Sequence, residues 1–272
     1  MLCCWGMLVH ATLDFPGWGD PNAPAHLHVA PEYLEQAYEK TATPNVVTAV
    51  LADYRSYDTM FETAVVFSAG LACFFLLRVQ SRKKEEEEEE DRYFRHLATD
   101  MVIRIRTPSM HVPDSPYLQQ LDPYWTPRSL IVRAACRVLT PFIQLFALYV
   151  VAHGHHSPGG GFQGGVILGA SLILVALSHD LRTSMKMTPE KLMGVLSPAG
   201  VLIYAGVGAL CVAAGHNFLD YGALAEWLGT APEAARSLGI LFVEVGVAVC
   251  VMATMIIIYA NLSSAGGHKQ GL

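Results

Sequence analysis

The sequence predicts an all-α integral membrane protein with about six transmembrane helices, two followed by four, joined by a cytoplasmic polar linker. Hydrophobic residues make up 52% of the 272 residues and charged residues 15%, whereas soluble domains average about 45–50% and about 25%. Six predominantly apolar segments approach the roughly 20 residues that cross a bilayer core of about 30 Å. Many of the charged residues gather between the second segment and the third.

The six predicted spans cover residues 1–15, 59–78, 130–152, 162–180, 194–215 and 238–261. Only helices and closed barrels satisfy their backbone groups within lipid, and these runs are longer than the roughly 9–11 residues of a barrel strand. We therefore expect helices. The first segment lacks a basic n-region and an A-x-A cleavage site, so we expect it to be retained as a short span.

Basic residues predict the orientation of these spans. In the arrangement above, 15 of the 18 Lys and Arg residues fall on one side of the membrane, and Lys40, Arg55 and Arg236 fall on the other. Short loops that are rich in Lys and Arg stay in the cytoplasm. We therefore expect a multi-pass protein of the cytoplasmic (inner) cell membrane with both termini in the cytoplasm.

Composition divides the chain into a two-helix part (1–79), a charged and Pro-rich linker (80–128) and a four-helix part (129–272). The linker contains the run Glu85–Glu90, and a run of like charges is usually solvated. The arginines follow membrane ends and no aromatic residues are interleaved with them, so no nucleic-acid partner is expected. The six cysteines form no C-x-x-C pair. We expect no cofactor, no metal and no catalytic residue.

The first group of chemically informative residues comprises Asp53, Arg55, Asp58 and Glu62. Asp58 and Glu62 are four apart, so they share a helix face. About fifteen uncharged residues follow Glu62, which places it inside the hydrocarbon or at its edge, where a charge costs about 2.5–3.5 kcal/mol. Such residues serve ion or proton paths. The alternative is helix capping by Asp58, with Glu62 near the positive helix end and Arg55 paired with Asp58.

The second group is the segment VVAHGHHSPGGGFQGGVILGA, residues 150–170, which joins two predicted spans with almost no polar loop. Its predicted hairpin residues are Pro158, Gly159, Gly160, Gly161, Phe162, Gly164 and Gly165. Pro158 and the three glycines that follow it interrupt a helix. Because non-helical backbone at membrane depth is tolerated only inside protein or beside water, we expect this hairpin to pack deeply against a neighbour.

Three histidines, His153, His155 and His156, lie beside the hairpin. Histidine titrates near neutral pH, so a proton relay is one interpretation. A structural role is the second. A metal site is the third, although no H-E-x-x-H spacing or nearby thiol supports it.

Glu244 lies about seven residues into the last predicted span, which contains no other Asp, Glu, Lys, Arg or His. A carboxylate in lipid requires a partner on another helix or another subunit. We therefore expect Glu244 to serve ion movement or assembly.

The motif HGHHSPGGGFQGGVILGASLILVALS resembles the signature of the MnhB-like component of Mrp-type multisubunit Na+/H+ antiporters, and the resemblance runs over residues 129–262. Upstream, residues 20–70 resemble the C-terminal portion of the Mrp A protein, and more closely the MbhE-type component of membrane-bound, hydrogen-evolving nickel–iron hydrogenases. The family pattern DYRGYDTLGE reads DYRSYDTMFE here, so Ser56 and Phe61 replace two glycines.

The resemblance implies a subunit of a cation/proton antiport module related to the membrane arm of respiratory complex I. It would work with other Mrp-type or hydrogenase-type membrane subunits, the lipid bilayer and transported Na+ or H+. The acids and arginine at 53–62 fall in the motif of the first relative, and His153, His155, Pro158, the glycine triplet and Phe162 fall in the MnhB-like motif. A membrane arm of a redox-driven hydrogenase and a stand-alone metal-binding protein are the alternatives.

Overall fold

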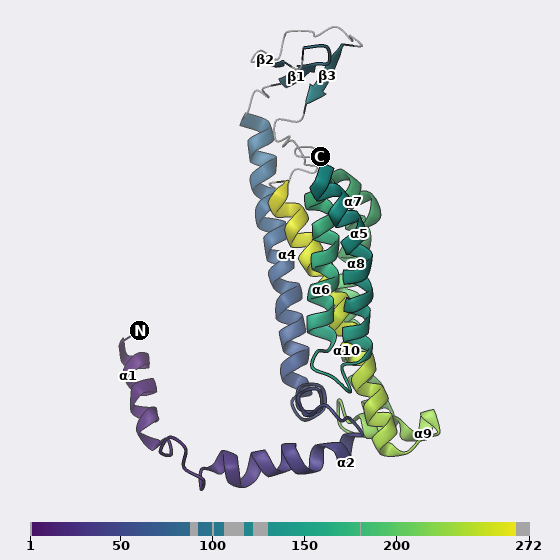
Figure 1. Cartoon of the computed structure of the whole chain (residues 1–272). Coiled ribbons are helices and arrows are strands. Elements are labelled where there is room, and N and C mark those ends of the chain that lie inside the picture. The colour runs from purple at the N-terminus through teal and green to yellow at the C-terminus, as the bar shows by residue number, and fades with distance from the viewer. Residues whose placement is uncertain are drawn as a thin grey trace.

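The computed structural model describes residues 2–87, 92–99, 101–105, 117–121, 130–179 and 181–264. Its main body is a bundle of five long helices (Figure 1), α4 (Ser56–Glu87), α5 (Leu130–Ala152), α6 (Gly161–Ser178), α8 (Glu190–Ala213) and α10 (Pro232–Ser263). The shorter helical elements are α1 (Leu2–Ala11), η1 (Thr12–Asp14), η2 (Ala25–Val29), η3 (Glu32–Gln36), α2 (Ala37–Thr41), α3 (Val46–Ala49), η4 (Val50–Tyr54), α7 (Leu181–Met187), η5 (Tyr221–Leu224) and α9 (Ala225–Leu228).

Among the described residues, five helices are long and apolar enough to cross a membrane: residues Ser56–Arg78 of α4, and α5, α6, α8 and α10. The prediction of an all-α membrane protein is confirmed. The predicted first span is wrong as a complete span, because α1 has ten residues. At about 1.5 Å per residue it measures about 15 Å, half the thickness of the hydrocarbon core.

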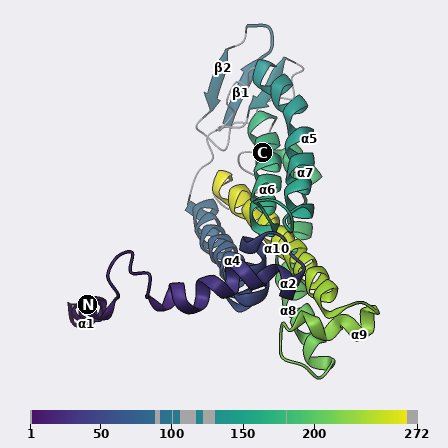
Figure 2. The ribbon, with the colours of Figure 1, turned by 60° about the horizontal axis from the view of Figure 1, so that its bottom comes forward.

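Five spans place Ser56 and Ser263 at opposite ends of the bundle (Figure 1). The even number of spans from which we predicted two cytoplasmic termini is therefore not found in the described part of the chain. The segment from η2 to α2 lies across the end of the bundle where α4 begins, and α1 stands apart from it (Figure 2).

Helix α10 organises the bundle, because it packs against α8, α6 and α4. Small residues allow these close approaches. A Cβ atom on Gly200 of α8 would overlap the backbone of Gly246 on α10, and one on Gly70 of α4 would lie 2.5 Å from Thr254 Cγ2. The core between these helices is lined by buried apolar and aromatic side chains, including Tyr204, Tyr221, Ile240, Val243, Val247 and Val251.

The predicted linker contains structure that the sequence analysis did not anticipate. Helix α4 runs without interruption to Glu87, past the predicted boundary at residue 80. Three strands follow, β1 (Arg92–His96), β2 (Val102–Ile105) and β3 (Leu118–Leu121), in an antiparallel sheet of order β2-β1-β3. Phe94 of β1 pairs with Ile103 and Gln120 and is 9% exposed, so a small apolar contact accompanies the sheet.

Candidate functional site

The carboxyl group of Glu244 lies in the interior of the bundle, against the N-terminus of α6. Glu244 is 7% exposed and lies about 18 Å along α10 from its first residue, at about 1.5 Å per residue. The backbone amide of Gly161, the first residue of α6, donates a hydrogen bond to this carboxyl. Its Oε2 atom has no hydrogen-bond partner among the described residues. The positive end of a helix dipole favours a negative group at this place.

Glycines of the hairpin surround the same carboxyl. A Cβ atom on Gly154 would lie 2.8 Å from Glu244 Oε2, and one on Gly160 would lie 2.8 Å from Oε1. A Cβ atom on Gly161 would overlap the backbone carbonyl of Glu244. Gly160 also has a φ of 131°, which other residues rarely adopt. The glycine hairpin therefore encloses the acid because these positions lack side chains.

Two residues from the N-terminal part of the chain hold the exposed backbone carbonyls of this hairpin. Asn45 Nδ2 donates to the carbonyl oxygens of Gly154 (2.9 Å) and Ser157 (2.8 Å), and Thr48 Oγ1 donates to Gly154 at 2.7 Å. The Asn45 amide donates to the His155 carbonyl at 2.9 Å. These bonds satisfy non-helical backbone that lipid could not. The predicted deep packing of the hairpin is thus accounted for by α10 on one side and residues 45–48 on another.

The remaining predicted hairpin residues occupy different positions. Gly164 approaches the backbone of α5, and a Cβ atom on Gly165 would lie 2.7 Å from the Ala248 carbonyl of α10. Pro158 is exposed, and Phe162 is 37% exposed.

The three histidines do not converge on one point. His155 is 8% exposed, and its Nε2–H donates to the Ser237 carbonyl of α10 at 2.8 Å, because a carbonyl oxygen only accepts. His153 is exposed and stacks on Tyr149, with ring centroids 4.2 Å apart, and His156 is exposed. No group of three or more His, Cys, Asp or Glu residues in the described part of the chain could hold a metal ion.

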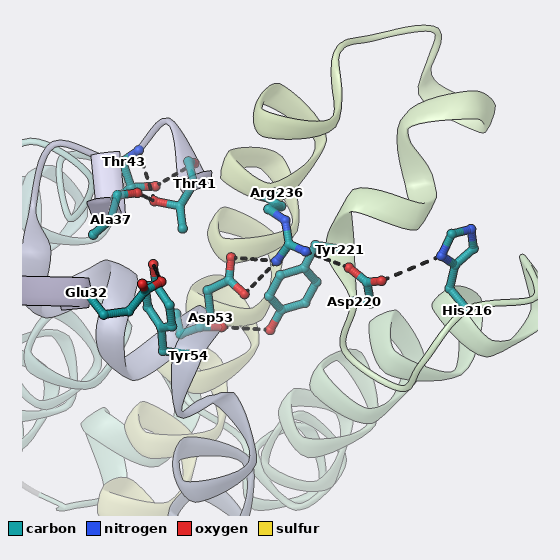
Figure 3. Close-up of polar contacts among 11 residues, drawn as sticks. Glu32, Ala37, Thr41, Thr43, Asp53, Tyr54, His216, Asp220, Tyr221 and Arg236 are labelled. Carbon is teal, nitrogen blue, oxygen red and sulfur yellow. Dashed lines mark hydrogen bonds and ion pairs between the residues drawn. The ribbon is translucent and has the colours of Figure 1, made fainter. Parts of the chain in front are cut away.

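Asp53 belongs to a chain of charges that crosses from η4 to α10 (Figure 3). Arg236 Nη1 contacts the two Asp53 carboxylate oxygens at 2.9 and 3.1 Å, and Arg236 Nη2 contacts Asp220 Oδ1 at 2.7 Å. His216 Nδ1 lies 3.5 Å from Asp220 Oδ2. The Asp53 side chain is 10% exposed. Burial raises the pKa of Asp53 above its ordinary value, although the adjacent Arg236 opposes this.

Tyrosine hydroxyls complete the contact between η4, α4 and the rest of the bundle. Tyr221 donates to the Ala52 carbonyl at 2.8 Å (Figure 3), and Tyr204 donates to the Ser56 carbonyl at 2.9 Å. Tyr54 donates to Glu32 at 3.1 Å. Burial, together with this carboxylate, raises the pKa of Tyr54 to about 12.

The other members of the first predicted group lie on the outer surface of the chain. Arg55 Nε donates to Asp58 Oδ2 at 2.6 Å, and both side chains are 59% exposed. Glu62 is exposed along α4. The group at 53–62 therefore separates, with Asp53 in the interior and Arg55, Asp58 and Glu62 outside.

Family models match both parts of the chain. The domain related to the MnhB subunit of Na+/H+ antiporters matches residues 131–257, and the MbhE model, which describes a component of MBH, matches residues 17–91. The corresponding MnhB-type Na+/H+ antiporter protein of Bacillus subtilis (strain 168) is 31% identical over 132 residues, which are 46% of this chain and 92% of the relative. This chain belongs to the MnhB family of antiporter proteins.

Two solved structures resemble the MnhB-family chain over almost its whole length. A chain of the Mrp complex from Dietzia sp. DQ12-45-1b has a TM-score of 0.53 and 25% identity, covering 92% of this chain and 24% of its own. A chain of the membrane-bound sulfane sulfur reductase, an archaeal respiratory membrane complex, has a TM-score of 0.56 and 22% identity. It covers 95% of this chain and 93% of its own, and shares the fold.

The polar contacts described above join the two matched regions. Asn45, Thr48 and Asp53 lie in the MbhE region, and their partners Gly154 and Arg236 lie in the MnhB region. Sequence analysis missed Asn45, Thr48, Asp220 and the partner role of Arg236. One signal was present for Arg236. An arginine near a helix N-terminus faces an unfavourable dipole, which indicates a nearby carboxylate.

Proposed function

We propose that this MnhB-family chain is a membrane subunit of a multisubunit cation/proton antiporter-type complex in the cell membrane, and that it contributes to ion translocation and to assembly. It performs no covalent chemistry in this proposal. Its partners are other Mrp-type membrane subunits and the lipid bilayer, and Na+ or H+ is the transported ion. The end of the bundle near Arg78 and Lys191 faces the cytoplasm, because basic residues gather there.

The observation that carries the proposal is the enclosure of Glu244. Transferring an unpaired carboxylate into a protein interior costs several kcal/mol, and binding a proton or a cation removes that charge. Glu244 has one oxygen bonded to a helix N-terminus and one without a partner among the described residues. A group of this kind can take up and release an ion as its surroundings change hydration.

The other predicted residues take different parts in this proposal. Glu62, exposed on α4, faces a hydrated path formed with a neighbouring subunit, and the Arg55–Asp58 pair lies at its entrance. Asp53 and His155 hold the elements that enclose Glu244, and His153 and His156 exchange protons at the outer rim.

The test is transport by the assembled complex with Glu244→Gln, which keeps the shape of the side chain and removes its charge. We expect cation-dependent proton movement in everted vesicles to fall about tenfold or more, within the range by which acid–base groups contribute. Glu226→Gln, in the exposed helix α9, is the matched control and keeps wild-type transport. An assembled Glu244→Gln complex with wild-type transport would contradict the proposal.

A redox-driven ion pump is the second candidate, and the match of residues 17–91 to the MbhE model favours it. In that case the same membrane subunit would couple ion movement to a hydrogenase-like arm. Purification of the native complex separates the two candidates. Stoichiometric nickel or iron–sulfur proteins in the complex support the redox pump, and their absence from an active complex supports the antiporter.

A further inference from the structure

A groove of about 420 Å³ opens between α4, α8 and α10, away from Glu244. Its apolar wall is formed by Phe67, Leu71 and Phe74 of α4 and Ile257 of α10, and Gly70 and Gly194 leave it narrow and smooth. Helix α4 belongs to the MbhE region, and α8 and α10 belong to the MnhB region. The groove therefore follows the seam between the two regions at bilayer depth.

The floor of the groove suits an apolar occupant. Ser197 Oγ and Thr254 Oγ1 lie 2.6 Å apart and share a hydrogen bond. Both are buried, at 2% and 1% exposure. Because the two hydroxyls satisfy each other, a hydrocarbon chain can lie over them without leaving a polar group unpaired.

The mouth of the groove is polar and carries a net positive charge. Arg78 Nη2 contacts Glu190 Oε1 at 2.5 Å, and its guanidinium carbon lies 4.6 Å from the centroid of the Phe74 ring. Lys191, the next residue along α8, lines the groove and is exposed. No ion pair of Lys191 is present within the described part of the chain. Two cations and one carboxylate thus meet at the lipid–water boundary.

We propose that this groove binds an anionic phospholipid, with one acyl chain against α4 and α10 and the phosphate beside Lys191 and Arg78. Basic pockets between transmembrane helices on the cytoplasmic side bind anionic headgroups. The lipid fills the seam between the two regions and strengthens the packing of α4 on α8 and α10. This inference does not depend on the role of Glu244.

The groove offers a matched pair of variants for the test. Gly194 lines it and has open space where a Cβ atom would be, so Gly194→Phe fills the groove without a backbone clash. Gly206 lies on the same helix, also has open space, and does not line the groove, so Gly206→Phe is the control. Lys191→Gln removes the exposed charge at the mouth.

The experiment is native mass spectrometry of the purified, delipidated complex after addition of phosphatidylglycerol or phosphatidylcholine. We expect wild type and Gly206→Phe to retain phosphatidylglycerol about fivefold more than phosphatidylcholine, a difference of about 1 kcal/mol, as expected for one lysine near the phosphate. Gly194→Phe should lose one bound phosphatidylglycerol, and Lys191→Gln should lose the preference for it.

Three outcomes would overturn the proposal. The first is equal retention of the two lipids by wild type. The second is the same phosphatidylglycerol count for the Gly194→Phe and Gly206→Phe complexes. The third is a cross-link from a photoreactive residue at position 194 to another subunit in the native membrane, which would mean that a protein helix occupies the groove.

Discussion

Glu244 shows how the absence of side chains can create a site. Gly154, Gly160 and Gly161 each lie where a Cβ atom would meet an atom of Glu244. Removing three side chains lets the hairpin backbone and the α6 N-terminus reach the carboxyl directly. A larger residue at any of these positions would move the amide of Gly161 away from the acid, or move α6 away from α10.

The first prediction is that Gly161→Ala destabilises the protein. The added methyl group overlaps the backbone carbonyl of Glu244, and overpacking of this kind costs about 1–3 kcal/mol. We expect a lower thermal unfolding midpoint for the detergent-solubilised complex. Gly206→Ala, on α8 with open space around its Cβ position, should leave the midpoint unchanged or raise it, because alanine favours a helix by up to about 1 kcal/mol. Equal midpoints for the two variants would reject this account.

At the scale of elements, η4 is fastened to α10 by a charge pair that is mostly buried. Arg236 is 30% exposed and contacts both Asp53 and Asp220. Removing one partner of a fully buried pair costs about 3–5 kcal/mol, and we expect Arg236→Gln to cost about 2 kcal/mol because water reaches the guanidinium. The two carboxylates would then be left without the cation that they share.

The second prediction concerns the pH dependence of this contact. Burial raises the pKa of Asp53 above its ordinary 3.8, so the folded protein binds this proton more tightly than the unfolded chain. Its stabilising contribution is therefore complete below pH 3.8 and is lost as pH rises through the folded pKa. Asp53→Asn should flatten this part of the curve of unfolding midpoint against pH. The exposed Asp58→Asn is the control, and an identical curve for Asp53→Asn and wild type would show that Asp53 does not contribute.

At the scale of the whole molecule, an odd number of spans sets which loops share a side. The loop before α10 and the helix α7 lie at opposite ends of the bundle (Figure 1). Basic residues gather near α7, so that end faces the cytoplasm in our proposal.

The third prediction is a labelling pattern. In a chain with Cys3→Ser and Cys4→Ser, we expect Thr230→Cys to react with an impermeant maleimide in intact cells and Lys186→Cys to react only after lysis. Both positions are exposed, and Cys136, Cys211 and Cys250 are buried. The reverse pattern would invert the proposed orientation, and labelling of both positions in intact cells would contradict the five spans.

The spans could be predicted from the sequence because lipid imposes a strong local constraint. About 20 apolar residues are needed to cross the bilayer, and α5, α6, α8 and α10 each satisfy this within one continuous run. The α1 segment was wrong as a complete span because an apolar run also occurs in a ten-residue helix. The sheet of β1–β3 was missed because short strands in a charged, Pro-rich stretch carry little periodic signal.

The sequence by itself determined the membrane class, four of the spans almost to the residue, the helix-breaking hairpin and the presence of an acid inside the last span. Tertiary structure alone decided which groups meet. Glu244 meets the hairpin, Asn45 meets Gly154 and Asp53 meets Arg236, the last pair 183 residues apart. The physical reason is that hydropathy is a property of one segment, whereas these contacts depend on how each helix is rotated and translated against α10 by the packing of small residues.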